Sequence, residues 1–196
     1  MTTHPLAILV VCTGNICRSP MAERVLAAKL ERAGVATVVT SAGTHALVGA
    51  PMTDQARALT EKLGAPGADH RARLLTADLV ASADLVLTAT REHRHAVVSL
   101  HPRAARFAFT LRQFARLVDD VEFDGSGVHD GPTLVTEAAA LRGLVAPPAT
   151  PELDDIVDPY RRSQAVYDEA AEAVDAAVTT IVTALRQAHT VVRPQS

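Results

Sequence analysis

Apolar residues along the chain fall into short runs that alternate with helical patterns. The first run, residues 6–11, is continuous and rich in branched side chains, which is typical of a strand buried on both faces of a parallel sheet. Similar runs predict strands at residues 35–40, 84–88 and 106–109, and apolar residues at helical spacing predict helices at 20–33, 52–63, 91–100, 111–118 and 166–185. Because strands alternate with helices, we expect a doubly wound α/β fold, with a mainly parallel sheet of about four strands and helices on both faces.

One segment, residues 119–150, interrupts this alternation. It contains Gly- and Pro-rich turn sequences at residues 124–127, 130–132 and 147–148. The only regular element that its pattern indicates is a short helix over residues 133–141. We therefore predict a single domain over residues 1–196 with a surface insertion at 119–150.

Composition and charge narrow the class of protein. The share of hydrophobic residues is 48%, that of charged residues is 21%, and the net charge is −3, so the chain lacks the basic surface expected of a nucleic-acid-binding protein. Its two cysteines lie five residues apart, which is no disulfide framework of a secreted fold. Neither a signal-peptide pattern nor an apolar run long enough to span a membrane is present. We expect a cytoplasmic protein without stable membrane insertion.

The segment after the first predicted strand carries the candidate chemistry. It reads Cys-Thr-Gly-Asn-Ile-Cys-Arg-Ser-Pro over residues 12–20, and Pro20 suits the first turn of a helix. At this edge of a parallel sheet, loop N–H groups and a helix N-terminus favour an anion such as phosphate. A thiol at Cys12 would ionise more readily in that field, and the planar guanidinium of Arg18 could hold two phosphate oxygens.

The other residues of this segment suit a tight anion-binding loop. Gly14 permits turns that other residues avoid, Asn15 tolerates left-handed geometry, and the Ser19 hydroxyl can donate to the Cys12 sulfur. A lone cysteine after a buried strand is more often a small core residue, and a cysteine and an arginine at this spacing also occur by chance. The loop by itself therefore leaves catalysis and simple packing as equal alternatives.

Residues 11–20 match throughout the signature of the low-molecular-weight protein tyrosine phosphatases, Val-Cys-x-Gly-Asn-Ile-Cys-Arg-Ser-Pro. Residues 41–44 (Ser-Ala-Gly-Thr), 84–87 (Asp-Leu-Val-Leu) and 158–160 (Asp-Pro-Tyr) resemble further segments of that family. The resemblance covers most of the chain except residues 119–150. It implies a phosphatase that acts on a phosphotyrosine-containing protein or a small aryl phosphate and needs neither a metal nor another cofactor.

The resemblance also implies roles for individual residues. Cys12 would attack phosphorus and form a phosphocysteine, Arg18 would bind the phosphoryl oxygens, and Asp158 would protonate the leaving group and later activate water. The residues expected to bind phosphate or substrate are Thr13, Gly14, Asn15, Ile16, Cys17, Ser19, Leu47 and Tyr160. Members that prefer phosphotyrosine usually carry an aromatic residue after the segment that corresponds to residues 41–44, and here we expect Leu47 to take its place, with Tyr160 as the opposite wall.

Two other functions remain open at this point. An arsenate reductase on the same fold would need an external thiol, because this chain has no cysteine besides Cys12 and Cys17. A non-catalytic phosphoprotein-binding module need not keep a nucleophile, a clamp and an acid together. The five-residue spacing also suggests that Cys17 could resolve an oxidised Cys12 as a disulfide. The histidines, including His70 and His93, form no ligand-like cluster, so we expect them to be solvated or locally bonded.

Overall fold

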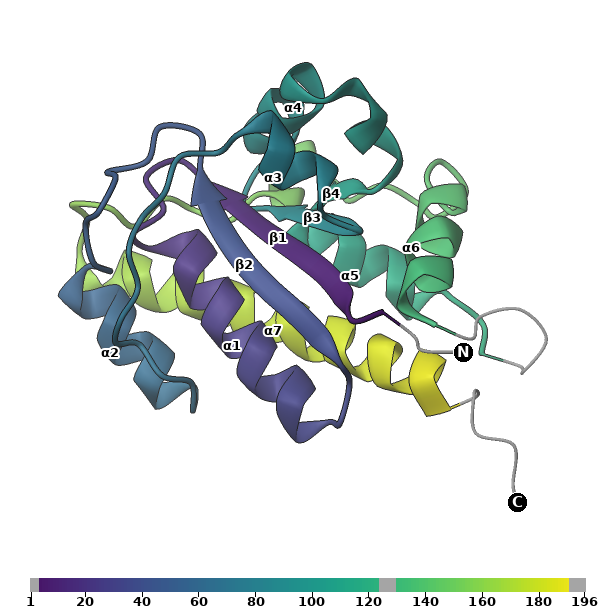
Figure 1. Ribbon diagram of the computed structural model, residues 1–196, viewed down its shortest axis with the longest axis horizontal. Helices are drawn as coiled ribbons and strands as arrows, with labels where there is room; N and C mark the ends of the chain where they lie inside the picture. The colour runs from purple at the N-terminus through teal and green to yellow at the C-terminus, as the bar shows by residue number, and fades with distance from the viewer. Residues whose placement is uncertain (1–3, 124–129, 191–196) are drawn as a thin grey trace.

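The computed structural model describes residues 4–123 and 130–190 and is built around one parallel sheet (Figure 1). Its four strands are β1 (Leu6–Cys12), β2 (Thr37–Gly43), β3 (Leu85–Thr88) and β4 (Ala108–Thr110), in the order β2-β1-β3-β4. Strand β1 lies in the centre and pairs with β2 along its whole length, from Leu6 opposite Thr37 to Cys12 opposite Gly43. The expected four-stranded doubly wound sheet is confirmed.

Helices cover both faces of the sheet. They are α1 (Arg18–Arg32), α2 (Asp54–Lys62), α3 (Ala77–Ala81), α4 (Arg91–Leu100), α5 (Leu111–Asp119), α6 (Gly131–Ala140) and α7 (Gln164–Thr190), with 3-10 turns η1 (Pro102–Arg106) and η2 (Pro151–Asp154). On one face α1, α5 and α7 pack against the sheet, and α3 and α4 lie on the other (Figure 1).

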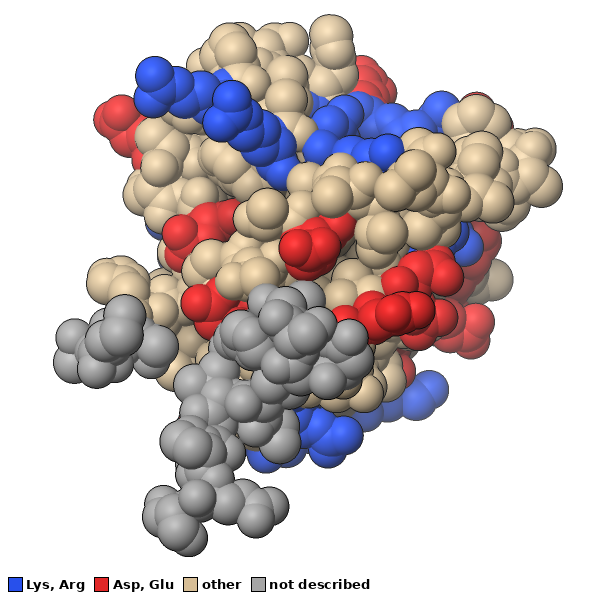
Figure 2. All heavy atoms as spheres, turned by 90° about the vertical axis from the view of Figure 1, so that its right-hand side faces the viewer, with Lys and Arg blue, Asp and Glu red and all other residues tan. Residues whose placement is uncertain are grey.

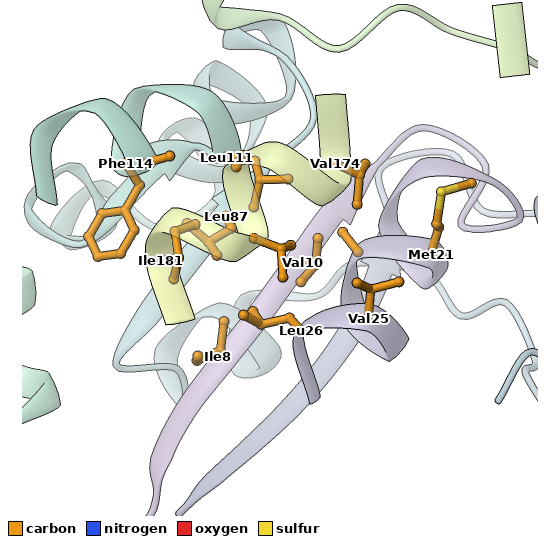
Figure 3. Packing of buried hydrophobic residues seen from close by; sticks show 14 of the residues in the cluster. Ile8, Val10, Met21, Val25, Leu26, Leu87, Leu111, Phe114, Val174 and Ile181 are labelled. Atoms are coloured by element: carbon orange, nitrogen blue, oxygen red, sulfur yellow. The ribbon is translucent and has the colours of Figure 1, made fainter. Parts of the chain in front are cut away.

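The side chains of β1 alternate between two cores. Ile8 and Val10 belong to the larger core, where they meet α1 and α7, whereas Leu9 and Val11 belong to the smaller core on the other face. Figure 3 shows Ile8 and Val10 among side chains of α1 and α7, including Leu26. This two-sided burial explains why the first apolar run of the sequence is continuous rather than alternating.

Threonine residues begin most of the helices. Thr53, Thr76, Thr90 and Thr110 each accept a hydrogen bond from a backbone N–H in the first turn of the following helix, at α2, α3, α4 and α5. Helix α1 differs, because its N-cap residue is Cys17 and no side chain caps it. Its first N–H groups are therefore left to other partners.

Several element boundaries differ from the sequence expectation: the strand expected at 35–40 runs from Thr37 to Gly43, and the helix expected at 166–185 runs from Gln164 to Thr190. The helix expected from residue 52 begins at Asp54, after its Thr53 cap. The strand expected at 106–109 occupies 108–110 instead, because Arg106 closes the 3-10 turn η1. Helix α3 was not expected at all, since one short turn of five residues carries too little periodicity to be recognised.

Within residues 119–150, helix α6 occupies most of the short helix that the sequence predicted. Asp130 caps it, and its Leu134 and Ala138 are buried in the larger core. Residues 124–129, with the turn expected at 124–127, lie outside the described part of the chain. The insertion and the single-domain boundary stay predictions. Among the described residues, no helix combines the length and apolarity that a membrane crossing requires.

Candidate active site

Most of the predicted site residues line a cavity of about 170 Å³ at the carboxyl edge of β1. The cavity is lined by Cys12, Thr13, Gly14, Ile16, Cys17, Arg18, His45, Leu47, Asp158 and Tyr160. Asn15 and Ser19 are fully buried behind the loop and do not line the cavity. Three segments that are distant in the sequence, residues 12–18, 45–47 and 158–160, therefore meet at this cavity.

Cys12 is buried, and its sulfur lies 2.9 Å from Ser19 Oγ. The Ser19 hydroxyl accepts a hydrogen bond from Asn15 Nδ2 at 2.9 Å. Because that acceptor position is filled by an amide donor, the hydroxyl hydrogen of Ser19 is free to point at the sulfur. The Ser19 hydroxyl can therefore donate a hydrogen bond to the Cys12 sulfur.

Asn15 holds the loop in its tight conformation. Its φ of 55° lies in the left-handed region, which asparagine tolerates better than most residues. Its Nδ2 also donates to Ser41 Oγ at 2.8 Å, and its Oδ1 accepts from the Arg73 backbone N–H at 3.0 Å. His70 Nε2 donates to the Asn15 carbonyl at 2.6 Å, and burial lowers the pKa of His70. Four contacts therefore fix one loop residue.

The backbone after β2 follows the catalytic loop closely. The N–H groups of Thr44, His45 and Leu47 donate to the carbonyls of residues 12, 13 and 14, at 2.9, 3.0 and 3.1 Å. Gly43 permits this approach, because a Cβ there would collide with the Thr13 carbonyl oxygen. These backbone hydrogen bonds place Leu47 at the cavity.

Arg18 faces the cavity from the first position of α1 and is almost fully buried. Its Nη2 lies 2.9 Å from Asp158 Oδ2, and its Nη1 donates to the Ile156 carbonyl at 3.1 Å. Its Nε is buried and has no hydrogen-bond partner among the described residues. Since α1 is also uncapped, a phosphate in the cavity would meet guanidinium and backbone donors together.

Asp158 is exposed and reaches the cavity from the segment before α7, where its Oδ1 accepts from the Tyr160 N–H at 3.2 Å. The preceding residues are anchored to the β3–α4 connection. The Ile156 N–H donates to the Ala89 carbonyl at 2.8 Å, and Asp155 Oδ1 accepts from the Arg91 N–H at 2.8 Å. These bonds hold the segment that contains Asp158 beside the loop of residues 12–19.

The walls of the cavity are largely apolar. Ile16 is buried, while Leu47 and Tyr160 are 46% and 39% exposed at the rim. The guanidinium of Arg161 stands 5.1 Å from the centre of the Tyr160 ring, which holds that ring through a cation–π contact. Asp158 is the only carboxylate among the lining residues. This combination suits a phosphate carried on an apolar, flat group.

Comparison with known proteins agrees with this geometry. The family model described as low molecular weight phosphotyrosine protein phosphatase matches residues 7–127. A probable low molecular weight protein-tyrosine-phosphatase, EpsP of Ralstonia nicotianae, is 31% identical over 179 residues, which cover 91% of this chain and 95% of that protein. The chain belongs to the low molecular weight phosphotyrosine protein phosphatase family.

Two further relatives show the breadth of the family. The crystal structure of the Erwinia amylovora tyrosine phosphatase AmsI matches with a TM-score of 0.68 and 26% identity, over 94% of this chain and 95% of that one. A protein-arginine-phosphatase of Bacillus subtilis is 42% identical over 108 residues, which are 55% of this chain and 71% of that protein. The chain is therefore a cysteine-dependent phosphatase, a phosphoric monoester hydrolase whose substrate is a phosphoprotein or an aryl phosphate.

Two histidines of the phosphatase have closer links to the loop than the sequence suggested. His93 is 6% exposed, and its ring lies between Thr13 Oγ1, 2.8 Å from Nε2, and Thr90 Oγ1, 2.7 Å from Nδ1. Burial, assisted by the charge of Arg18, lowers the pKa of His93 to about 4, so its ring is neutral at neutral pH. His70 also forms a hydrogen bond with the loop, and His45 lines the cavity, so both histidines contribute to the site.

The sequence contained only a weak signal for these histidines. Thr90 and His93 stand three residues apart where a helix follows a strand, which is a capping pattern rather than a catalytic one. In the described part of the phosphatase, no three histidine, cysteine, aspartate or glutamate residues gather as a metal site would require. The role of these histidines therefore emerges only from contacts across 55 and 80 residues of sequence.

Cys17 is buried and lines the cavity. Its sulfur is 3.4 Å from Thr53 Oγ1 and 3.7 Å from the Tyr167 hydroxyl, and burial raises the pKa of this thiol. Both cysteines are free thiols. That Cys17 resolves an oxidised Cys12 stays a prediction.

Proposed function

We propose that this phosphatase hydrolyses phosphotyrosine in cytoplasmic proteins, with Cys12 as nucleophile, Arg18 as phosphate clamp and Asp158 as general acid and base. The observation that carries the proposal is the meeting of these three side chains at one cavity with apolar walls. Phosphate binding then falls to the loop residues 13–19, and aryl binding to Leu47 and Tyr160.

In the first step, the Cys12 thiolate attacks phosphorus while the bond from phosphorus to the aryl oxygen breaks. Asp158, in its acid form, gives its proton to that departing oxygen, so the products are a phosphocysteine and a neutral phenol. Charge on the three equatorial oxygens meets Arg18 and the N–H groups at the start of α1. A phosphate that binds Arg18 also competes with Asp158 for that guanidinium and so frees the carboxyl group for the leaving oxygen.

In the second step, water attacks the phosphorus of the phosphocysteine. Asp158, now a carboxylate, takes one proton of that water, and the sulfur leaves as a thiolate. The Ser19 hydroxyl, 2.9 Å from the sulfur, stabilises the thiolate that leaves. Inorganic phosphate is released and the site returns to its starting protonation state.

Phosphoarginine is the competing substrate class, because one relative is a protein-arginine-phosphatase. A phosphorylated guanidinium carries N–H donors that need acceptors when water is excluded. Among the described lining residues the only carboxylate is that of Asp158, which the proposed mechanism uses for proton transfer at the leaving atom, and the Ile16 and Leu47 side chains offer no acceptor for the other N–H groups. The cavity therefore favours the flat apolar ring of phosphotyrosine.

Paired peptides test this preference directly. Two peptides of the same sequence, one with phosphotyrosine and one with phosphoarginine, are compared by phosphate release, with the Cys12→Ser protein as the blank. We expect kcat/KM to be at least about tenfold higher for phosphotyrosine, a difference of about 1.4 kcal/mol in transition-state stabilisation. Equal or higher values for phosphoarginine would refute the substrate class but leave the cysteine chemistry intact.

A further inference from the structure

A second cavity, of about 760 Å³, lies at the opposite edge of the sheet from the catalytic loop. It is enclosed by α6 and by the segments that lead into β3 and β4, residues 83–84 and 105–107. These segments precede the amino ends of their strands, whereas the catalytic loop follows the carboxyl end of β1. The cavity is therefore separate from the active site.

Arginine side chains gather at this cavity without acidic partners. Arg106 and Arg142 line it, and Arg142 donates to the carbonyls of Ala105 and Ala108, the latter at 2.6 Å. Arg94 donates to the same Ala108 carbonyl at 2.7 Å, so two guanidinium groups share one acceptor. Within residues 4–123 and 130–190, no carboxylate forms an ion pair with any of these three arginines.

This concentration of positive charge is costly. Burial and the nearby charge of Arg94 lower the pKa of Arg142 to about 10, and burial lowers the pKa of Arg94 as well. The Nε atom of Arg142 is buried and lacks a hydrogen-bond partner among the described residues. Among the described lining residues the only carboxylate is that of Asp84, which accepts a hydrogen bond from the Ala7 N–H at 2.8 Å. An anion in the cavity would relieve this imbalance.

The surface shows the same separation of charge. Figure 2 looks at the side of the molecule that is on the right in Figure 1, and Lys and Arg side chains gather in the upper part of this face, above a group of acidic side chains. The remaining wall of the cavity is apolar and includes Phe107 and Val135. A ligand there would meet positive charge on one side and apolar carbon on the other.

We propose that this cavity binds a small organic anion, whose phosphate or carboxylate group contacts Arg106 and Arg142 and whose apolar body packs against Phe107 and Val135. Its volume lies within the range of about 300–1,000 Å³ that small-molecule sites occupy. Planar guanidinium groups suit oxyanions with two neighbouring oxygens. Arg142 and Val135 both come from residues 119–150, so the site depends on the segment that interrupts the repeating pattern of the sequence.

Titration with phenylphosphonate and, separately, with inorganic phosphate tests the proposal by two-dimensional amide NMR. Both probes also bind the catalytic loop, but amide signals of residues 12–19 and of residues 105–107 report the two sites independently. We expect saturable shifts at residues 105–107, with phenylphosphonate binding there more tightly than phosphate because its ring gains the apolar wall. Arg106→Gln should weaken this binding by at least about tenfold, as expected for the loss of a charged hydrogen bond.

Arg103→Gln is the matched control, because Arg103 is exposed on the same turn η1 but does not line the cavity. It should leave phenylphosphonate binding unchanged, and neither substitution should change aryl phosphatase activity. The proposal is overturned if only the signals of residues 12–19 move, if phosphate binds residues 105–107 as tightly as phenylphosphonate, or if Arg103→Gln weakens binding as much as Arg106→Gln.

Discussion

At the scale of single residues, the hydrogen bonds of Ser19 and Asn15 orient the hydroxyl group that faces the Cys12 sulfur. Asn15 fills the acceptor position of the Ser19 hydroxyl, which leaves the hydroxyl hydrogen for the sulfur of Cys12. Arg18 has one buried nitrogen, Nε, without a hydrogen-bond partner in the described part of the chain, on a side chain that lines the cavity. A buried donor without a partner is expensive, so such a donor in a cavity indicates a ligand.

Asp158→Ala tests the general acid. We expect phosphate release from substrates with poor leaving groups, such as phosphotyrosine peptides, to slow by roughly 10²–10⁴-fold, because their departing oxygen needs a proton. The loss should be much smaller for p-nitrophenyl phosphate, whose leaving group is stable as an anion. A series of aryl phosphates of graded leaving-group pKa measures the trend, and the same loss for every member would exclude Asp158 as the acid.

His93 links the stability of the phosphatase to pH. Its pKa falls from about 6.5 to about 4 on folding, so the folded state favours the neutral ring. The folded state therefore loses stability, by up to about 3 kcal/mol, as the pH falls from about 6.5 towards 4, because the unfolded chain then binds a proton that the buried ring does not. We expect His93→Gln to be less stable than the wild type at pH 7, and this difference to shrink at pH 4.5.

Urea unfolding at both pH values measures the difference. His95→Gln is the control, since His95 is exposed on the same helix α4. That variant should follow the wild type at each pH. A stability difference between His93→Gln and the wild type that stays constant from pH 7 to pH 4.5 would show that His93 does not titrate with folding.

At the scale of elements, the start of α4 holds the two catalytic segments together. Its His93 contacts Thr13 of the catalytic loop, and the Arg91 N–H donates to Asp155, three residues before the acid. The Ala89 carbonyl, just before the helix, accepts from Ile156. This connection therefore helps to set the distance between Cys12 and Asp158, together with the contacts of Arg18 with Asp158 and the Ile156 carbonyl. Helix α1 contributes in a different way, because its uncapped N-terminus leaves backbone donors at the cavity.

Asp155→Ala should disturb the acid while leaving the nucleophile in place. The substitution removes the acceptor for the Arg91 N–H and its ion pair, whose closest contact is 3.0 Å. We expect kcat for phosphotyrosine peptides to fall by about tenfold, because small displacements of a catalytic group are costly, while p-nitrophenyl phosphate turnover changes less. Asp155→Asn keeps a side-chain oxygen for the N–H and should retain most of the activity. Equal losses for both substrates would mean that Asp155 supports the site as a whole rather than the acid.

At the scale of the whole molecule, the sequence predicts the arrangement of the sheet and its helices better than the side-chain contacts between distant segments. Strands β1 and β3 are recognisable because each is an apolar run buried on both faces of the sheet, as Leu9 and Val10 of β1 show by entering different cores. The catalytic loop is recognisable because its residues are contiguous. His70, His93 and Asp155 were missed as site residues because they reach the site through hydrogen bonds between segments that are distant in the sequence. The arginine cavity, similarly, depends on how α6 packs beside β4.

The most direct test of the central claim is to detect the phosphocysteine on Cys12. The Asp158→Ala protein is mixed with p-nitrophenyl phosphate, quenched within the first turnovers, digested and analysed by mass spectrometry, since that variant forms the intermediate readily but hydrolyses it slowly. We expect one phosphoryl group on the peptide that contains Cys12, on the sulfur of that residue, and none on the same peptide of the Cys12→Ser, Asp158→Ala protein. A burst of p-nitrophenol without a phosphorylated Cys12, or a phosphoryl group on another residue, would contradict it.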